Sequence, residues 1–474
     1  MRPSFVFDQN KCTGCQACQL ACIIENELEP DASWRAIHTF NERHYPGAPL
    51  FHISLACNHC AEPACMNACP ALAYSRDSET GAVLIDQNKC IGCRYCTWAC
   101  PYDAAKFDST KGVISKCTFC YHRIKQRLEP ACVALCPTAA LGFELLPDDE
   151  LINESYGFTT THMKPAIKII PLHQSRLLPQ EVSPRVQGQQ SVDGAAVASR
   201  ITLRSEWSLA LFTYLGAVLF ALGAAAATAR LHVNSLLFLV IALIAVRVST
   251  LHLGRKRCAW RAALNVTHSW LSREVVLFSV YVVAAAAFLM LQPGGRVWGW
   301  TTTLLGAAAI FSMDRVYRYA INRTPEWLHS ASVLLTGIFI AGVLALNPVV
   351  AGLAGILKLI LYLWRKTEFA RRRLSVRPVA SAARLGLGFG LPLGLAMADG
   401  ARLYWLVVAC VLVGELIDRC EFYAEIDVMT PGKQMAIDLQ RSVTTDLDRT
   451  DWPTRSSPPP RLQSTAGGAA RRPE

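Results

Sequence analysis

Cysteine is scarce in the larger part of this 474-residue chain. Of the 19 cysteines, 16 lie between Cys12 and Cys136, and only Cys258, Cys410 and Cys420 follow them. The later part is rich in Leu, Ala and Val, so the chain changes class partway along. A chain of this length and uneven composition predicts more than one domain.

An excess of positive charge is missing from the cysteine-rich part. Residues 1–146 hold 13 Lys and Arg against 14 Asp and Glu, whereas the whole chain has a formal net charge of +11. The basic excess therefore lies in the later, apolar part. This distribution argues against nucleic-acid binding by the N-terminal part, and we expect no nucleic-acid partner.

The N-terminus also lacks the marks of an exported protein. The first ten residues, MRPSFVFDQN, have no apolar core region and no twin arginine. We therefore expect the cysteine-rich part to stay in the cytoplasm, where disulfides are rare. This argues against the simplest structural interpretation of the cysteines, a framework of disulfide bonds.

What is present is a regular pattern of thiols, opened by the stretch CTGCQACQLAC. The cysteines form four groups of four: Cys12, Cys15, Cys18 and Cys22; Cys57, Cys60, Cys65 and Cys69; Cys90, Cys93, Cys96 and Cys100; Cys117, Cys120, Cys132 and Cys136. In the last three groups proline follows the final cysteine, at Pro70, Pro101 and Pro137. The first group has Ile23 in that position.

The spacing within the groups favours iron–sulfur clusters over zinc. Zinc sites usually pair two Cys-x-x-Cys knuckles. Here a third cysteine and then a fourth follow, which is typical of ferredoxins. Three closely spaced thiolates bind three corners of one cubane, and the fourth reaches the neighbouring cluster. Four groups then predict two interlocked pairs and four [4Fe–4S] clusters.

The stretches CNHCAEPACMNACP, CIGCRYCTWACPYDAAKFDSTKG, KCTFCYHRI and CVALCP resemble the electron-transfer subunit of the dimethyl sulfoxide reductase family. The resemblance covers about residues 3–146 and implies an α+β, ferredoxin-like tandem [4Fe–4S] domain at 1–146. It implies these ligand sets: Cys12, Cys15, Cys18 with Cys136; Cys117, Cys120, Cys132 with Cys22; Cys57, Cys60, Cys65 with Cys100; Cys90, Cys93, Cys96 with Cys69.

Two polar segments follow from composition. Residues 147–204 lack periodicity, and we expect a strap along the first domain followed by a flexible linker. Residues 436–474 end in RSSPPPRLQSTAGGAARRPE and predict a disordered tail.

Between these segments lie eight apolar runs that predict an all-α, eight-helix transmembrane bundle at 205–435. The runs are 207–229, 235–253, 275–292, 298–313, 328–346, 348–364, 385–399 and 403–418. Buried helices of a soluble protein are the alternative. Tryptophans at or near the run ends argue for the membrane, because interfacial aromatic residues lie there.

The loops after the second, fourth and sixth runs are basic: RKRCAWR, DRVYRYAINR and RKTEFARRRLSVR. The other loops hold little beyond Arg230, Arg296 and Arg402. The positive-inside rule then predicts a multi-pass protein of the inner membrane, with both termini and the iron–sulfur domain in the cytoplasm.

The segments STLHLG, RAALNVTHSWLSRE and GELIDRCEFYAEIDVMTPG resemble the membrane anchor of the same reductase family, over about residues 205–435. The two subunits are usually separate chains in that family, so the resemblance implies a natural fusion. It also implies a quinol site and no haem. A b-type haem between His252 and His329 is the alternative.

Ionisable residues near the cytoplasmic membrane face are candidates for the quinol site, because such residues are costly in a membrane. They are His252 and Arg247 at the end of the second run, and Asn265, His268, Arg273 and Glu274 in the next segment. A histidine suits the proton step of quinol oxidation because its pKa lies near neutrality. The alternative is that Arg247 snorkels and the others anchor the interface. Lys358, Asp314 and Glu415 are weaker candidates.

These features predict a redox subunit that oxidises membrane quinol and passes electrons through four clusters. By resemblance, the acceptor is a large cytoplasmic molybdopterin subunit that reduces an S-oxide or N-oxide and carries the substrate's active site. The same path run in reverse, as in sulfite oxidation with quinone reduction, stays open. A redox-sensing or assembly protein is a further alternative, but no output element is visible in the sequence.

Overall fold

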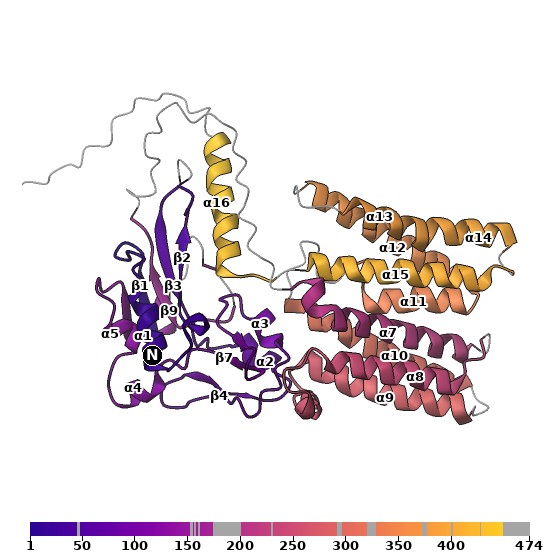
Figure 1. The fold of residues 1–474 in the computed structure, drawn as a ribbon, viewed down its shortest axis with the longest axis horizontal. Helices are drawn as coiled ribbons and strands as arrows, with labels where there is room; N and C mark the ends of the chain where they lie inside the picture. The colour runs from indigo at the N-terminus through magenta and orange to yellow at the C-terminus, as the bar shows by residue number, and fades with distance from the viewer. Residues whose placement is uncertain are drawn as a thin grey trace, which may run out of the picture.

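The computed structural model describes residues 1–44, 48–151, 155, 158–159, 162–173, 201–228, 231–291, 296–319, 329–371, 377–399, 402–426 and 428–448. Two parts lie next to each other (Figure 1). The cysteine-rich domain is built from short strands and helices, and the second part is a bundle of long helices. We expect a strap and a flexible linker at 147–204, and residues 174–200 of this segment lie outside the described residues.

A three-stranded sheet ties the two ends of the cysteine-rich domain together. Its central strand β1 (Arg2–Asp8) pairs antiparallel with β8 (Leu141–Leu146) and parallel with β9 (Ile167–Ile170). Side chains alternate along β1, so Phe5 and Phe7 both point into the core. The strand β9 belongs to the segment expected to lie along this domain.

The rest of the domain consists of small units that present the cysteines. Three antiparallel hairpins are β2 (Ala36–Phe40) with β3 (Phe51–Leu55), β4 (Tyr74–Arg76) with β5 (Val83–Ile85), and β6 (Lys106–Asp108) with β7 (Val113–Ser115). The helices are α1 (Ala17–Glu25), α2 (Ala64–Ala68), α3 (Tyr95–Ala99), α4 (Tyr121–Lys125) and α5 (Ala131–Ala134), with 3₁₀ turns η1 (Pro30–Ala32) and η2 (Asp148–Glu150).

Each of the eight apolar runs coincides with helical structure in the bundle. The helices are α7 (Leu203–Ala227), α8 (Ser235–Thr250), α9 (Trp270–Leu291), α10 (Arg296–Val316), α11 (Val333–Leu344), α12 (Pro348–Arg371), α13 (Pro378–Leu385), the π-helical turn η5 (Gly386–Gly390), α14 (Leu391–Asp399) and α15 (Tyr404–Glu425). The 3₁₀ segments η3 (Lys256–Ala263) and η4 (Tyr317–Tyr319) follow α8 and α10.

Within the described residues, four helical stretches are long and apolar enough to cross a membrane: Leu203–Ala227, Trp270–Leu291, Pro348–Arg371 and Pro378–Ala398. The helices Ser235–Thr250 and Val333–Leu344 are apolar but shorter. Eight crossings therefore stay a prediction, while a membrane-anchoring helical region is supported.

Local sequence explains where several of these helices begin. The side chain of Asn234 accepts hydrogen bonds from the amides of Leu236 and Leu237 at the start of α8. Thr202 and Ser205 form a reciprocal capping box at the start of α7. Such caps satisfy amides that an apolar helix cannot pair within itself.

The expected disordered tail at 436–474 is wrong over its first part. The helix α16 (Pro431–Asp448) crosses that boundary and packs beside β2 of the cysteine-rich domain (Figure 1). Met435 is buried there and Leu439 packs on the same core. The apolar residues Met435 and Leu439 are four apart, which places them on one helix face. Residues 449–474 lie outside the described part.

The two parts meet through a close contact of backbones. Gly92 and Gly112 of the cysteine-rich domain have positive φ angles, and both face Gly254, just after α8. The Gly254 amide donates to the Gly92 carbonyl at 3.4 Å, and the Arg255 amide donates to the Ile91 carbonyl at 3.1 Å. A Cβ atom at Gly254 would collide with the carbonyl oxygen of Gly112.

Gly254→Ala should therefore loosen the junction between the two parts. The added methyl group has no space, and overpacking of this kind costs about 1–3 kcal/mol. We expect a lower thermal unfolding midpoint in detergent and faster proteolysis between the two parts. Gly394→Ala is the matched control, since nothing lies within 4 Å of a Cβ at that helical position. Equal stability of the two variants would contradict this account of the junction.

Candidate functional site

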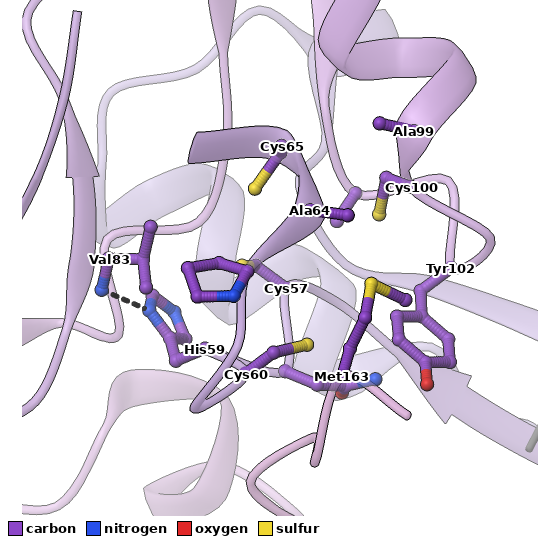
Figure 2. A pocket seen from close by; sticks show the side chains of 13 residues that line it. Cys57, His59, Cys60, Ala64, Cys65, Val83, Ala99, Cys100, Tyr102 and Met163 are labelled. Carbon is purple, nitrogen blue, oxygen red and sulfur yellow. Dashed lines mark hydrogen bonds between the residues drawn. The ribbon is translucent and has the colours of Figure 1, made fainter. Parts of the chain in front are cut away.

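Four thiols converge on one cavity in the centre of the cysteine-rich domain. Cys57 and Cys60 follow β3, Cys65 lies in α2, and Cys100 directly follows α3. Their sulfur atoms point into the same space, which Met163 and Tyr102 also line (Figure 2). The structure thus brings together one of the four expected ligand sets, from three separate segments.

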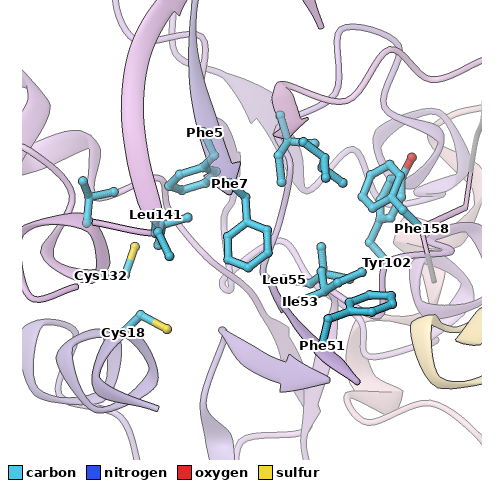
Figure 3. Packing of buried hydrophobic residues seen from close by; sticks show 14 of the residues in the cluster. Phe5, Phe7, Cys18, Phe51, Ile53, Leu55, Tyr102, Cys132, Leu141 and Phe158 are labelled. Carbon is cyan, nitrogen blue, oxygen red and sulfur yellow. The ribbon is translucent and has the colours of Figure 1, made fainter. Parts of the chain in front are cut away.

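Electrostatic interactions link thiols within the other three expected sets. Cys12 interacts with Cys15, Cys18 and Cys136; Cys22 interacts with Cys120, Cys132 and Cys117; Cys93 interacts with Cys69 and Cys90, and Cys96 with Cys93 and Cys69. They also link thiols of neighbouring sets, such as Cys18 with Cys132. Figure 3 shows Cys18 and Cys132 beside the aromatic core that contains Phe5 and Phe7. The assignment of the sixteen cysteines to four sets stays what the family resemblance implies.

We name the four groupings by their position. The membrane-facing set is Cys69, Cys90, Cys93 and Cys96; the second set is Cys57, Cys60, Cys65 and Cys100; the third set is Cys22, Cys117, Cys120 and Cys132; the outer set is Cys12, Cys15, Cys18 and Cys136. Cys15 is the one exposed member of the sixteen.

The sets follow one another across the domain because single elements serve two of them. The α2 segment carries Cys65 and Cys69, and the α3 segment carries Cys96 and Cys100. Cys57 of the second set packs in one small cluster with Cys117 of the third. The helix α1 then carries one cysteine of the third set and one of the outer set. The order is continuous from the bundle to Cys15.

Burial affects the protonation of the thiols. Burial raises the pKa of Cys22 to about 11, so its thiol keeps its proton at neutral pH until a metal centre displaces it. Across the described residues, no three His, Cys, Asp or Glu side chains converge tightly enough to hold one metal ion.

The membrane-facing set lies directly against the bundle. Asn265 donates from its side-chain nitrogen to the Cys69 carbonyl at 2.9 Å, and Ser269 donates from its hydroxyl to the Ala68 carbonyl at 2.8 Å. The Tyr95 hydroxyl of α3 donates to the Val316 carbonyl at 2.7 Å. Cluster ligands and bundle residues therefore share hydrogen bonds across the junction.

The structure separates the six candidate residues for the quinol site. Asn265 is buried in the junction just described, so its amide is already used. Arg273 donates to the carbonyls of Val266 and Thr267 and stacks on Trp270, which anchors its own loop. These two residues have structural partners.

Arg247 and His268 lie at the surface. Arg247 is an exposed residue of α8, and the exposed His268 ring contacts the Thr267 hydroxyl at 2.8 Å. Snorkelling accounts for the position of Arg247 near the end of an apolar helix.

His252 and Glu274 are placed differently. The His252 ring nitrogen Nδ1 is buried and makes no geometric hydrogen bond among the described residues, while the ring interacts with the backbone of Ser249. The His252 carbonyl accepts from Arg94 at 3.4 Å. Glu274 is buried in α9, where its electrostatic neighbours include Arg419 and Asp314. Both lie beside elements that contact the membrane-facing set.

The aromatic surroundings of Glu274 are not apparent from the sequence. Tyr95, Tyr317 and Tyr423 each interact electrostatically with this carboxyl group. The hydroxyls of Tyr317 and Tyr423 contact each other, and Arg419 lies over both rings. These residues come from three distant segments, so no local spacing signals their meeting.

The weaker candidates have structural partners. Asp314 accepts from the amides of Val333 and Leu334 at 2.7 and 3.0 Å, so it caps α11. Lys358 and Glu415 are fully buried and form an ion pair at 2.9 Å. This pair belongs to a larger buried network in which Arg365 and Arg384 pair with Asp418.

His329, the partner considered for a haem, also belongs to this network. Its Nε2 lies 2.8 Å from Nη1 of Arg365, and its Nδ1 lies 3.0 Å from the Ala331 amide. Both ring nitrogens therefore have partners in this structure.

Comparison with known proteins assigns a family to both parts. Residues 49–145 match the 4Fe–4S dicluster domain, and residues 201–375 match the dimethyl sulfoxide reductase anchor subunit. Together, these matches and the four apolar helices indicate an iron–sulfur protein with a membrane anchor.

The relatives of the cysteine-rich part are components of several reductases and a dehydrogenase. The protein is 41% identical over 155 residues to one component of the anaerobic dimethyl sulfoxide reductase of Escherichia coli K12, which covers 31% of this chain and 74% of the relative. It is 33% identical over 203 residues to one subunit of the sulfite dehydrogenase of Allochromatium vinosum, covering 37% and 85%. One subunit of the tetrathionate reductase of Salmonella typhimurium is 36% identical over 137 residues, covering 28% and 54%.

The matches to both parts of the chain agree with the fold, in which a cysteine-rich domain lies against a helical bundle. The protein belongs to the dimethyl sulfoxide reductase family, as a fusion of its iron–sulfur subunit with its membrane anchor.

Proposed function

We propose that this protein carries electrons between membrane quinol and a cytoplasmic molybdopterin subunit through four [4Fe–4S] clusters. The observation that carries the proposal is the unbroken order of the four cysteine sets, from the bundle to the exposed Cys15. The catalytic reduction of an S-oxide or N-oxide then takes place on the partner subunit. Relatives named as parts of larger enzymes support such a partner.

In this proposal the sixteen cysteines hold the clusters in the four sets named above. When bound, each cluster accepts and donates one electron at a time. The protein's contribution is to bury the thiolates, keep water away and fix the order of the sets. The α2 and α3 segments each carry cysteines of both the membrane-facing set and the second set, and this fixes the position of one set relative to the other.

Quinol oxidation requires a proton acceptor close to the cluster of the membrane-facing set. We assign this role to His252, whose Nδ1 is buried at the junction and makes no geometric hydrogen bond among the described residues. Glu274 lies among tyrosine hydroxyls and is the candidate for passing on the second proton. Arg94 links the two parts, because it contacts the His252 carbonyl and forms an ion pair with Glu206 at 3.7 Å.

The reverse direction is the second candidate function. The relative named as a sulfite dehydrogenase subunit is as extensive a match as the reductase components, which favours considering substrate oxidation with quinone reduction. A sensing or assembly role has less support, because the matched families are an iron–sulfur domain and an enzyme anchor. Co-purification with a large molybdenum-containing subunit distinguishes an enzyme subunit from a sensor.

Anaerobically purified protein should contain about sixteen iron atoms and as many acid-labile sulfides per chain, because the thiols form four complete sets. Elemental and sulfide analysis measure both. Cys420→Ser, outside the four groups, should retain the full content. A value near eight iron atoms, or stoichiometric zinc, would refute the assignment of four clusters.

His252→Ala should slow the reduction of the clusters by quinol about a hundredfold or more, since it removes the general base. Reduction by a dye that reaches the clusters from the cytoplasm should be unchanged, because no cysteine is altered. The control is His232→Ala, an exposed histidine before α8. If both assays fall together, His252 serves folding; if neither changes, the quinol site lies elsewhere.

Both termini should lie in the cytoplasm, because the basic loops follow the even-numbered runs. A reporter fused after residue 474 should therefore read as cytoplasmic, and a reporter fused after residue 230 should read as periplasmic. A periplasmic signal from the first fusion would mean an odd number of crossings or an inverted bundle.

A further inference from the structure

Among the described residues of the cysteine-rich domain, Arg35 is buried without a carboxylate partner. Arg35 is 2% exposed, and its Nη1 donates to the hydroxyl of Ser54 at 3.0 Å. The guanidinium carbon lies 4.6 Å from the centre of the Phe5 ring. Its Nη2 is buried and has no hydrogen-bond partner among the described residues.

The ionisable groups around Arg35 are cysteine thiols. Ser54, which Arg35 contacts, lies 3.4 Å from the sulfur of Cys18. The groups that interact most with the guanidinium are cysteines of two sets: Cys132, Cys18, Cys117 and Cys22. Arg35 therefore lies between the outer set and the third set.

A cation in this position needs an anion. Burying an unpaired guanidinium away from water is strongly unfavourable. Removing the anion that neutralises a buried guanidinium is also strongly destabilising. Here the compensation comes from thiolates and from the clusters that they hold in the proposed function. Each electron that a cluster gains makes it more negative, so a nearby fixed positive charge stabilises the reduced form more than the oxidised form.

The buried cations are distributed unevenly along the path. In the described part of the cysteine-rich domain, only Arg35 and Lys116 are buried cations. Lys116 donates from Nζ to the carbonyl of Cys117, in the third set, at 2.7 Å. At the membrane-facing set the nearest basic side chain on the same loop, Arg94, is partly exposed and is paired with Glu206.

We propose that Arg35 raises the reduction potentials of the two clusters furthest from the membrane, and so draws electrons from the bundle toward the exposed end of the path. The proposal rests on the proposed function, since it requires clusters in the outer and third sets. In this proposal Arg35 supplies a fixed positive charge near two clusters and does not contact substrate. It also favours quinol oxidation over quinone reduction as the direction of electron flow.

Redox titration of the full-length protein, followed by electron paramagnetic resonance, tests the proposal. In Arg35→Gln, two of the four midpoint potentials should fall, each by at least a tenfold change in the reduction equilibrium, which is about 59 mV for one electron. The other two should stay unchanged. Arg35→Lys should keep potentials near those of the wild type, because the positive charge is retained.

The control is Arg43→Gln, which removes an exposed arginine of the same domain and should leave all four potentials unchanged. If Arg35→Gln does not retain its iron, Ser54→Asp replaces it, because a carboxylate beside Arg35 neutralises the charge without removing the side chain. The same two potentials should then fall.

The outcomes separate this inference from the proposed function. Wild-type protein with fewer than four clusters refutes the proposed function. Four clusters in the wild type, with unchanged potentials in an iron-replete Arg35→Gln or in Ser54→Asp, overturn the role of Arg35. A uniform fall of all four potentials also overturns it, since that result reports a general disturbance of the domain.

Discussion

The backbone contact between Gly254 and the pair Gly92 and Gly112 sets the relation between the two parts of this protein. Glycine is required there twice over, because two of the three residues have positive φ and none has room for a side chain. The contact brings the loop after α8 against the loop that holds Cys90 and Cys93. In the proposed function, electron transfer between the bundle and the membrane-facing set depends on that approach, since the two parts touch there.

Burial of charge is the second constraint, and the two parts meet it differently. In the bundle, Lys358, Arg365 and Arg384 are compensated by carboxylates on α15, so charges balance within the protein. Such networks are costly to break and fix how helices pack, because removing one partner leaves an isolated buried ion. In the cysteine-rich domain, Arg35 has thiols where the bundle has carboxylates. Its compensation therefore depends on the state of the thiols, which is the property a redox centre requires.

Local spacing predicts the thiol chemistry well and the junction poorly. Cys12, Cys15 and Cys18 lie close together because a short loop and the start of one helix hold them, so sequence alone indicates the kind of site. Asn265 and Glu274 lie nine residues apart, yet one supports the Cys69 carbonyl and the other lies among tyrosines from distant segments. No periodicity distinguishes these roles. The same limit explains α16: its polar composition indicates a tail, whereas Met435 and Leu439 find a partner surface only in the folded domain.

Joining the two subunits in one polypeptide changes what the junction must supply. The cysteine-rich domain is connected to the bundle before α7, and the polypeptide returns to it through α16, which follows α15 and packs beside β2. A tethered contact forms at a high effective concentration, so it needs less intrinsic affinity than a contact between separate subunits. The observed junction combines side-chain hydrogen bonds to backbone carbonyls with the glycine contacts and with an aromatic cluster that includes Tyr95 and Tyr317. In a fused chain, the geometry of the junction can therefore serve the position of the membrane-facing set more than the strength of binding between the two parts.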